Sequence, residues 1–213
     1  DMTPEKLEAL ADQLEGTLHY DTVTRKIYAT DASAYRELPL AVAIPKTVED
    51  IQKLILFAKK EGTSLIPRTA GTSLAGQVVG GGIVVDVSRE FTRIIEINTQ
   101  EHWVRVEPGV IRDELNMFLK PYGFLFGPET STANRAMIGG MVGNNSCGSN
   151  SVVYGSTRDH LLEVKALLSD GSAHVFGALT DEEFGAMTRA KSPLVASLYQ
   201  QAERILRDPV KQK

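Results

Sequence analysis

Hydrogen-bond donors are concentrated where a short apolar stretch, residues 64–66, gives way to a run of small residues and hydroxyls. A run of Gly, Ala, Ser and Thr lets backbone N–H groups turn toward one point and lets a ligand approach the chain closely. Hydroxyl and guanidinium side chains in the same run add further donors. The natural occupant of such a nest is a phosphate or a pyrophosphate. The candidate phosphate-binding residues are Pro67, Arg68, Thr69, Ala70, Gly71, Thr72 and Ser73.

Two common phosphate-binding motifs do not match this stretch, which together with residues 74–77 we call the first loop. Gly71 and Gly76 have the four-residue gap of a P-loop, but Gln77 and Val78 stand where Lys and Ser or Thr are required. The G-x-G-x-x-G fingerprint of a Rossmann domain is absent from the chain. A Gly-rich hairpin connection without a ligand therefore remains an alternative interpretation of the loop alone.

A second stretch of unusual composition, residues 127–156, which we call the second loop, is rich in Gly, Asn, Ser and Thr. A long loop of small polar residues in a compact domain is usually functional or disordered. Four apolar residues between positions 137 and 142 favour order. We predict a short helix over residues 138–144, whose first turn would offer free N–H groups to an anion or a polar ring.

The elements that must position the first loop form a strand–helix–strand sequence. Residues 40–44 are an apolar strand that Pro45 ends, and Thr47 then caps a helix that ends at Gly62. The next strand, residues 64–66, leads into the first loop, and residues 83–87 form a further strand. This order predicts a βαβ unit with a parallel sheet. Ligands of such sheets bind at the carboxyl ends of the strands, where the first loop lies.

The elements around the second loop have a different pattern. Residues 94–98 and 103–107 alternate as antiparallel strands do, and a helix is predicted over residues 111–122. Two apolar stretches on either side of Asp170-Gly171-Ser172 predict a hairpin, and residues 180–207 contain two helical segments. We expect an antiparallel sheet with helices against it. A helix from Pro4 and a polar segment over residues 16–38 that wraps the surface precede both halves.

Length, charge and cysteine content exclude several classes of protein. The 213 residues suit one large domain or two small subdomains that share a core. A net charge of −4 without a basic block argues against nucleic acid as the main partner. No apolar run is long enough for a membrane span or resembles a signal peptide. The single cysteine, Cys147, suits a reducing compartment, so we expect a cytoplasmic location and leave peripheral membrane attachment, as part of a larger protein, open.

The two loops together resemble the flavin-binding domain of the vanillyl-alcohol oxidase/p-cresol methylhydroxylase family, in its D-lactate dehydrogenase and glycolate oxidase FAD-subunit branch. The resemblance extends from about residue 40 to about residue 176, and its markers are residues 67–73, 128–131, 138–140 and 154–155. It implies an α+β, FAD-binding PCMH-type fold, in which a small parallel βαβ subdomain packs on a larger, mostly antiparallel α+β subdomain.

Domain boundaries follow from the same resemblance. We expect an N-terminal helix and wrapping segment over residues 1–38, and two FAD-binding subdomains over residues 39–90 and 91–178. Residues 179–213 would then form helices that lead to a substrate domain absent from this chain. The chain begins at Asp1 rather than Met, and it is interpreted as the N-terminal FAD domain of a larger protein.

The resemblance also assigns residues to parts of FAD. Residues 68–73 would bind the pyrophosphate, mainly through backbone N–H groups, with help from the hydroxyls of Thr72 and Ser73. Residues 128–131 and 139–140 would approach the ribityl chain and the pyrophosphate from the opposite side. Residues 144–148 would border the isoalloxazine ring, and Val106, Pro108 and Gly109 would lie nearer the adenine. The predicted FAD-binding residues beyond the first loop are Pro108, Gly109, Pro128, Glu129, Thr130, Ser131, Ile138, Gly139, Gly140, Asn144, Asn145, Ser146, Cys147, Gly148, Tyr154 and Gly155.

The activity implied is that of an FAD-linked oxidoreductase acting on CH–OH groups, which transfers hydride from a 2-hydroxy acid to FAD and passes electrons to a separate acceptor. Some family members bond the flavin through a His in the first loop. Because no His lies between His19 and His102, we expect non-covalent FAD. No catalytic residue is assigned, since the substrate-side residues of this branch come largely from the absent cap domain, and the chain alone is expected to be inactive.

The four His residues have no ligand spacing and Cys147 has no C-x-x-C partner, so neither a metal site nor a redox role for Cys147 is predicted. A homo-oligomer is left open, because apolar surface that a cap normally covers would be exposed. The alternative functions are an enolpyruvyl-reductase type of flavoenzyme domain and a non-catalytic binding module.

Overall fold

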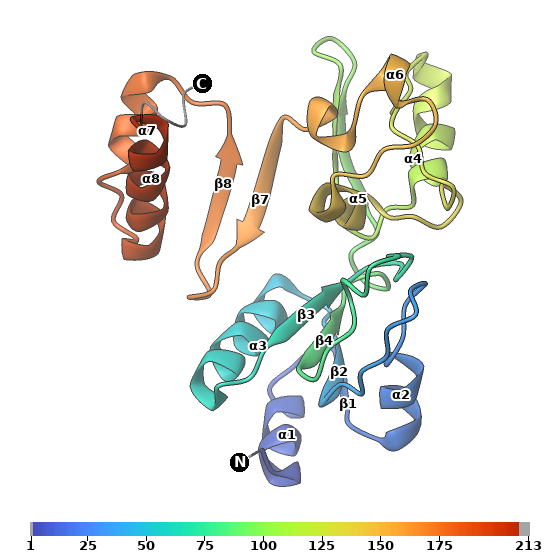
Figure 1. Cartoon of the computed structure of the whole chain (residues 1–213), viewed down its shortest axis with the longest axis vertical. Helices are drawn as coiled ribbons and strands as arrows, with labels where there is room; N and C mark the ends of the chain where they lie inside the picture. The colour runs from blue at the N-terminus through green and yellow to red at the C-terminus, as the bar shows by residue number, and fades with distance from the viewer. Residues whose placement is uncertain (1, 209–213) are drawn as a thin grey trace. The chain divides into compact units, whose positions relative to one another are not determined.

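The computed structural model describes residues 2–208 of the chain. The chain divides into two compact units, the first up to Leu161 and the second from Leu162 onward (Figure 1). The mixed α and β content confirms the expected α+β class. The subdomain boundaries expected near residues 38, 90 and 178 remain predictions.

The first unit contains a four-stranded sheet in the order β1-β2-β4-β3. Strands β2 (Ala41–Ile44) and β3 (Leu65–Arg68) both run parallel to β4 (Ile83–Asp86), which lies between them. The predicted βαβ unit with a parallel sheet is therefore confirmed. All four residues of β4 are buried, as expected for a central parallel strand whose faces are both covered.

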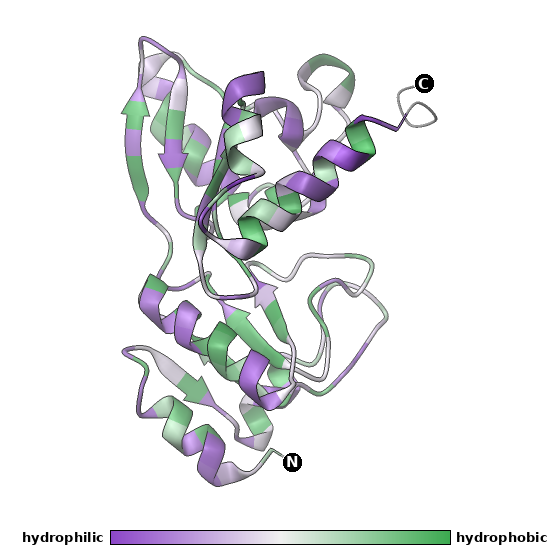
Figure 2. Ribbon diagram, turned by 90° about the vertical axis from the view of Figure 1, so that its left-hand side faces the viewer, coloured by the Kyte–Doolittle hydropathy of each residue, from purple (hydrophilic) through white to green (hydrophobic). Residues whose placement is uncertain are grey.

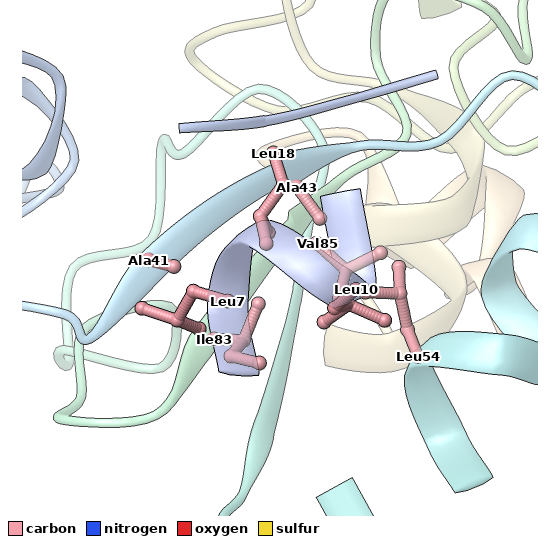
Figure 3. Packing of buried hydrophobic residues seen from close by; sticks show 8 residues of the cluster. All are labelled: Leu7, Leu10, Leu18, Ala41, Ala43, Leu54, Ile83 and Val85. Atoms are coloured by element: carbon pink, nitrogen blue, oxygen red, sulfur yellow. The ribbon is translucent and has the colours of Figure 1, made fainter. Parts of the chain in front are cut away.

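Helices α1 (Pro4–Ala11) and α3 (Val48–Glu61) pack against this sheet (Figures 1 and 3). The Thr47 hydroxyl accepts a hydrogen bond from the N–H of Asp50, and Gly62 ends α3 in the left-handed conformation, as the sequence predicts. The core that joins these helices to the strands consists of Leu7, Leu10, Leu18, Ala41, Ala43, Leu54, Ile83 and Val85.

The polar segment over residues 16–38 has more regular structure than the sequence indicates. It contains β1 (Thr17–His19), which pairs antiparallel with β2, and α2 (Thr22–Ile27), whose N-terminus the Asp21 carboxylate caps. That this segment wraps the surface of the domain remains a prediction. A three-residue strand with one buried side chain, Leu18, is too short to show an alternating pattern.

The rest of the first unit carries the second loop. Strands β5 (Ile94–Asn98) and β6 (Trp103–Val106) pair antiparallel, and α4 (Arg112–Leu119) continues into a 3-10 turn, η1 (Lys120–Tyr122). Helices α5 (Ile138–Asn144) and α6 (Ser151–Tyr154) and the 3-10 turn η2 (Thr157–His160) follow. Val110, Leu115 and Leu119 form the buried core of this part.

The second unit is a hairpin followed by two helices. Strands β7 (Glu163–Leu167) and β8 (Ala173–Gly177) pair antiparallel, and α7 (Asp181–Met187) and α8 (Pro193–Leu206) follow, as predicted. Helix α8 carries both hydrophobic and hydrophilic residues (Figure 2) and buries Val195 and Tyr199. Within residues 2–208 the strands of the second half form two separate antiparallel ladders, β5-β6 and β7-β8, rather than the single sheet we expected. None of the helices described there has the length and apolar character that crossing a membrane requires.

Asp50 ties the start of α3 to the segment that precedes β1. Its carboxylate is fully buried and accepts three backbone hydrogen bonds, from the N–H groups of Glu15 (2.9 Å), Gly16 (2.8 Å) and Lys46 (2.9 Å). Burial raises the pKa of this carboxyl group, but the backbone donors together outweigh burial and hold the pKa below its ordinary value of 3.8. The charged form of Asp50 therefore stabilises the fold.

The variant Asp50→Asn is expected to lower the free energy of unfolding by about 1–3 kcal/mol, because the amide presents N–H groups to the backbone donors. Because the folded pKa is depressed, the Asp50 contribution is present above pH 3.8 and is lost as the pH falls through the folded pKa. Urea unfolding at neutral and acid pH measures both effects. The control is Asp12→Asn, which changes an exposed carboxylate. Equal stabilities of the two variants would contradict the claim that the charged form of Asp50 stabilises the fold.

Candidate functional site

The first loop begins at the carboxyl end of β3 and keeps the backbone donors of residues 69–73 free. The N–H of Val87 donates to the carbonyl of Arg68 (3.0 Å), which is the last residue of β3. Gly71 and Gly76 have positive φ values of 69° and 71°, so the chain turns at both. Among the described residues, no protein group accepts a hydrogen bond from the N–H groups of residues 69–73. The loop thus offers unused donors, as the sequence predicts.

The side chain of Arg68 contacts a segment that sequence analysis did not assign to the site. Its Nη1 donates to the carbonyl of Thr30 (2.8 Å), and its guanidinium carbon lies 5.2 Å from the ring centre of Tyr28. A Cβ on Gly71 would lie 2.4 Å from Nη2 of Arg68. The side chain of Arg68 therefore fixes the turn of the first loop to residues 28–30.

Half-buried Tyr28 and buried Asp86 continue this cluster. The Tyr28 hydroxyl donates to Oδ2 of Asp86 (2.5 Å), and Oδ1 of Asp86 accepts the N–H of Ser88 (2.8 Å). Asp86 ends β4, is 4% exposed and lies beside Arg68 in the strand register. Burial, followed by the hydrogen bond and the charge of Asp86, raises the pKa of Tyr28 to about 12. The Tyr28 hydroxyl consequently remains a donor, and the Asp86 carboxylate is directed at Tyr28 and Ser88.

Helix α5 begins against the turn that follows β6. The N–H of Ile138 donates to the carbonyl of Val110 (2.9 Å), and the N–H of Gly139 donates to the carbonyl of Pro108 (2.9 Å). We expected these N–H groups to be free, and for these two residues that expectation was wrong. A Cβ on Gly139 would lie 2.4 Å from Cβ of Pro108, so glycine permits this approach. The N–H of Gly140 donates to no other residue that the structure describes.

The first loop and α5 meet at two points. A Cβ on Gly140 would lie 2.5 Å from Oγ1 of Thr69, and Nε2 of Gln77 donates to Oδ1 of Asn144 (2.7 Å). The structure therefore brings together the first loop, the Pro108-Gly109 turn and both ends of α5. Gln77 was considered only as a mismatch to the P-loop pattern, and no sequence signal identifies its partner.

The turn after α5 is held by residues that were not predicted. Asn145 has a positive φ of 48°, and its Oδ1 accepts the N–H of Arg158 (2.9 Å). The carbonyl of Ser146 accepts hydrogen bonds from both the N–H (3.0 Å) and the hydroxyl (2.7 Å) of Thr157, which is 2% exposed. A capping box at Ser156 and Asp159, which the sequence S-T-R-D could have revealed, fixes this segment.

The remaining predicted residues contact one another at the start of the second loop. Oε2 of Glu129 accepts a hydrogen bond from Asn150 (2.8 Å), and a Cβ on Gly148 would lie 2.3 Å from the carbonyl of Glu129. The ring of Tyr154 packs against Gly127. Within the described part of the chain, no hydrogen bond joins residues 128–131 or 145–148 to the first loop. Their place around a common ligand remains a prediction.

Metal chemistry has no candidate centre in this arrangement. No three His, Cys, Asp or Glu side chains within residues 2–208 are grouped so that they could hold a metal ion. Cys147 is a free, exposed cysteine in the turn after α5. The available chemistry is that of hydrogen-bond donors arranged for an anionic ligand.

Comparison with known proteins defines the class to which this fold and site belong. The model of the FAD binding domain family matches residues 39–177, so the chain belongs to that family and FAD is its cofactor. The match spans both loops. The recognition of a PCMH-type FAD-binding domain from the sequence is confirmed.

The chain is similar in sequence to two dehydrogenases and in fold to one solved structure of another enzyme. The chain is 49% identical to D-2-hydroxyglutarate dehydrogenase of Escherichia coli over 158 residues. This aligned stretch is 71% of the chain but 16% of that protein. The chain is 30% identical over 173 residues to the mitochondrial D-lactate dehydrogenase [cytochrome] of Kluyveromyces lactis, covering 79% of the chain and 29% of that protein. An alkyldihydroxyacetonephosphate synthase structure shares the fold, with a TM-score of 0.72 and 18% identity over 85% of this chain and 36% of that one.

The residues present suit the pyrophosphate of FAD. An anionic ligand needs donors that are not already used, and residues 69–73 together with Gly140 supply such backbone N–H groups. Asp86, the strand-register partner of Arg68, already accepts hydrogen bonds from Tyr28 and Ser88. The donor set therefore fits the cofactor that the family implies.

The variant Gly139→Ala is expected to lower the free energy of unfolding by about 1–3 kcal/mol, because the new Cβ would overlap Pro108 and force a backbone shift. Gly143→Ala is the matched control, since the same helix has nothing within 4 Å of a Cβ there. The control should be neutral or more stable by about 0.5–1 kcal/mol. Urea unfolding of the two variants measures the difference, and similar stabilities would show that α5 does not pack closely on Pro108.

Proposed function

We propose that this chain holds FAD non-covalently within an oxidoreductase that oxidises a 2-hydroxy acid. The observation that carries the proposal is the meeting of the first loop and α5, with unused N–H groups on both sides of the contact. The 49% identity to a D-2-hydroxyglutarate dehydrogenase supports the substrate class. The identity to a D-lactate dehydrogenase [cytochrome] supports transfer of electrons to a separate acceptor.

In this proposal each segment holds one part of the cofactor. The N–H groups of residues 69–73, the hydroxyls of Thr72 and Ser73, and the N–H of Gly140 bind the pyrophosphate. Residues 144–148 border the isoalloxazine ring, residues 108–109 lie nearer the adenine, and residues 128–131 approach the ribityl chain. The second-loop residues Ile138, Tyr154 and Gly155 complete the set.

The chain's own residues bind and orient the cofactor, and the reacting carbon is handled elsewhere. When bound, FAD supplies the capacity to accept a hydride from the carbon that bears the substrate hydroxyl. No titratable side chain of this chain is assigned as the base, so we propose that the base and the substrate contacts come from a cap domain. A cytoplasmic location, which the single Cys147 supports, and a homo-oligomer are further parts of the proposal.

A flavin titration of the full-length protein tests the proposal. Purified protein should carry oxidised FAD, release it on acid precipitation, and lose the oxidised-flavin absorption band when D-2-hydroxyglutarate, D-lactate or glycolate is added without oxygen. Flavin that stays in the acid pellet would contradict non-covalent binding. Absence of reduction by all three acids would contradict the substrate class, and absence of FAD binding would overturn the function.

One pair of variants connects this titration to the site. The side chain of Gly140→Val would overlap Oγ1 of Thr69 and push the first loop away from α5, so the dissociation constant of FAD is expected to rise roughly ten-fold or more. Gly143→Val is the matched control, because the same side chain enters open space on α5. Equal affinities in the two variants would contradict binding between the first loop and α5.

A further inference from the structure

A chain of side-chain hydrogen bonds joins the two loops. Oγ of Ser73 donates to Oε1 of Gln77 and accepts the N–H of Gln77 (3.3 Å), so the Gln77 amide is oriented from within the first loop. Nε2 of Gln77 then donates to Oδ1 of Asn144 (2.7 Å), and Nδ2 of Asn144 donates to Oγ of Ser146 (3.1 Å). In the described part of the chain, the bond between Gln77 and Asn144 is the hydrogen bond that connects the first loop to the second.

The bond between Gln77 and Asn144 is the second of two contacts between the first loop and α5. Thr69 contacts Gly140 near the start of α5, and Gln77 contacts Asn144, the last residue of α5. The two contact points are about 6 Å apart along the helix, since each residue rises about 1.5 Å. The unused N–H groups of residues 69–73 belong to the stretch of loop between these points. The loop is therefore attached to α5 at both of its ends.

We propose that Gln77 is a positioning residue, which acts through Asn144 to hold the first loop against α5 around bound FAD. The inference rests on the proposed function and extends it, because Gln77 is assigned no contact with the cofactor. Without the bond, the contact of Thr69 with Gly140 is what remains, among the described residues, of the attachment of the first loop to α5. The far end of the loop could then move away from the helix, and the N–H groups would lose their common direction.

The physical properties of the pair set the size of the effect. Gln77 and Asn144 are both exposed, so the bond contributes little to the stability of the fold. The bond matters more for FAD binding. If it is lost, loop residues become mobile in the free protein, and ordering them again when FAD binds costs conformational entropy. Both side chains are uncharged amides, so the contribution of the bond does not change with pH between 5 and 9.

The dissociation rate of FAD from the full-length protein measures this role. Gln77→Ala is expected to accelerate dissociation about three- to ten-fold, which corresponds to the loss of one hydrogen bond. Gln77→Met, which keeps the length of the side chain without its amide, should have the same effect. Gln201→Ala is the matched control, because it removes a comparable exposed hydrogen bond to Ser197 (3.0 Å) within α8 and should leave the rate unchanged.

A double-mutant cycle separates positioning from general destabilisation. If Gln77 acts through Asn144, the variant that carries both Gln77→Ala and Asn144→Ala should release FAD no faster than Asn144→Ala alone. Thermal unfolding of the apoproteins should not distinguish Gln77→Ala from the wild type. Additive effects on the rate, an unchanged rate in both Gln77 variants, or an equal effect of Gln201→Ala would overturn the proposal. The proposal would also be overturned if the Gln77 variants bound FAD faster than the wild type and released it at the same rate, because the bond would then obstruct binding.

The same experiment distinguishes this inference from the function on which it rests. If the wild-type protein binds no FAD, the proposed function fails, and the role of Gln77 fails with it. If the wild type binds FAD and the Gln77 variants release it at the wild-type rate, only the role of Gln77 is contradicted.

Discussion

The close approach of α5 to Pro108 and to the side chain of Thr69 is the constraint on which the site depends. A helix can begin against Pro108 only if its second residue has no side chain, and Gly139 meets that requirement. Gly140 meets the same requirement toward Thr69. The two hydrogen bonds from Ile138 and Gly139 then hold the start of the helix to the turn after β6. Two adjacent glycines thus determine how near the first loop can come to the second.

The parallel sheet supports the other side of this contact. Buried Asp50 fixes α3 to the chain before β1, and the order β1-β2-β4-β3 brings the end of β3 beside the end of β4. Arg68 and Asp86, the last residues of these strands, are both bonded to the segment over residues 28–30. With its side chain engaged there, the start of the first loop is fixed, and its backbone donors remain available. The two halves of the site are therefore fixed by different means: glycine packing in one, and a polar cluster around buried Asp86 in the other.

Much of this organisation could be predicted from the sequence. The parallel unit follows from Thr47, Gly62 and the apolar strands, whose local signals agree with the tertiary structure. The predicted span of α5 matches the structure residue for residue, because Gly139 and Gly140 mark its start and Asn145 follows its end. The identification of an FAD-binding domain depended on the combination of two loops, since the first loop alone left a ligand-free hairpin open.

Other features depend on contacts between residues far apart in the chain, which local patterns do not encode. Tyr28 reaches Asp86 and Gln77 reaches Asn144 across 58 and 67 positions, so neither pair has a sequence signature. Strand β1 is recognisable only once β2 offers it a partner. The free N–H groups expected at Ile138 and Gly139 were assigned from helix geometry, and tertiary carbonyls from Val110 and Pro108 use them instead. Long-range pairing decides these points.

Amide hydrogen exchange of the full-length protein, with and without FAD, tests most directly the claim that the first loop and α5 form one cofactor site. The account predicts slower exchange with FAD at residues 69–73 and at Gly140, whose N–H groups gain acceptors. Ile138 and Gly139 should change little, because their N–H groups already donate to Val110 and Pro108. Unchanged exchange at residues 69–73 in protein that demonstrably holds FAD would contradict the account.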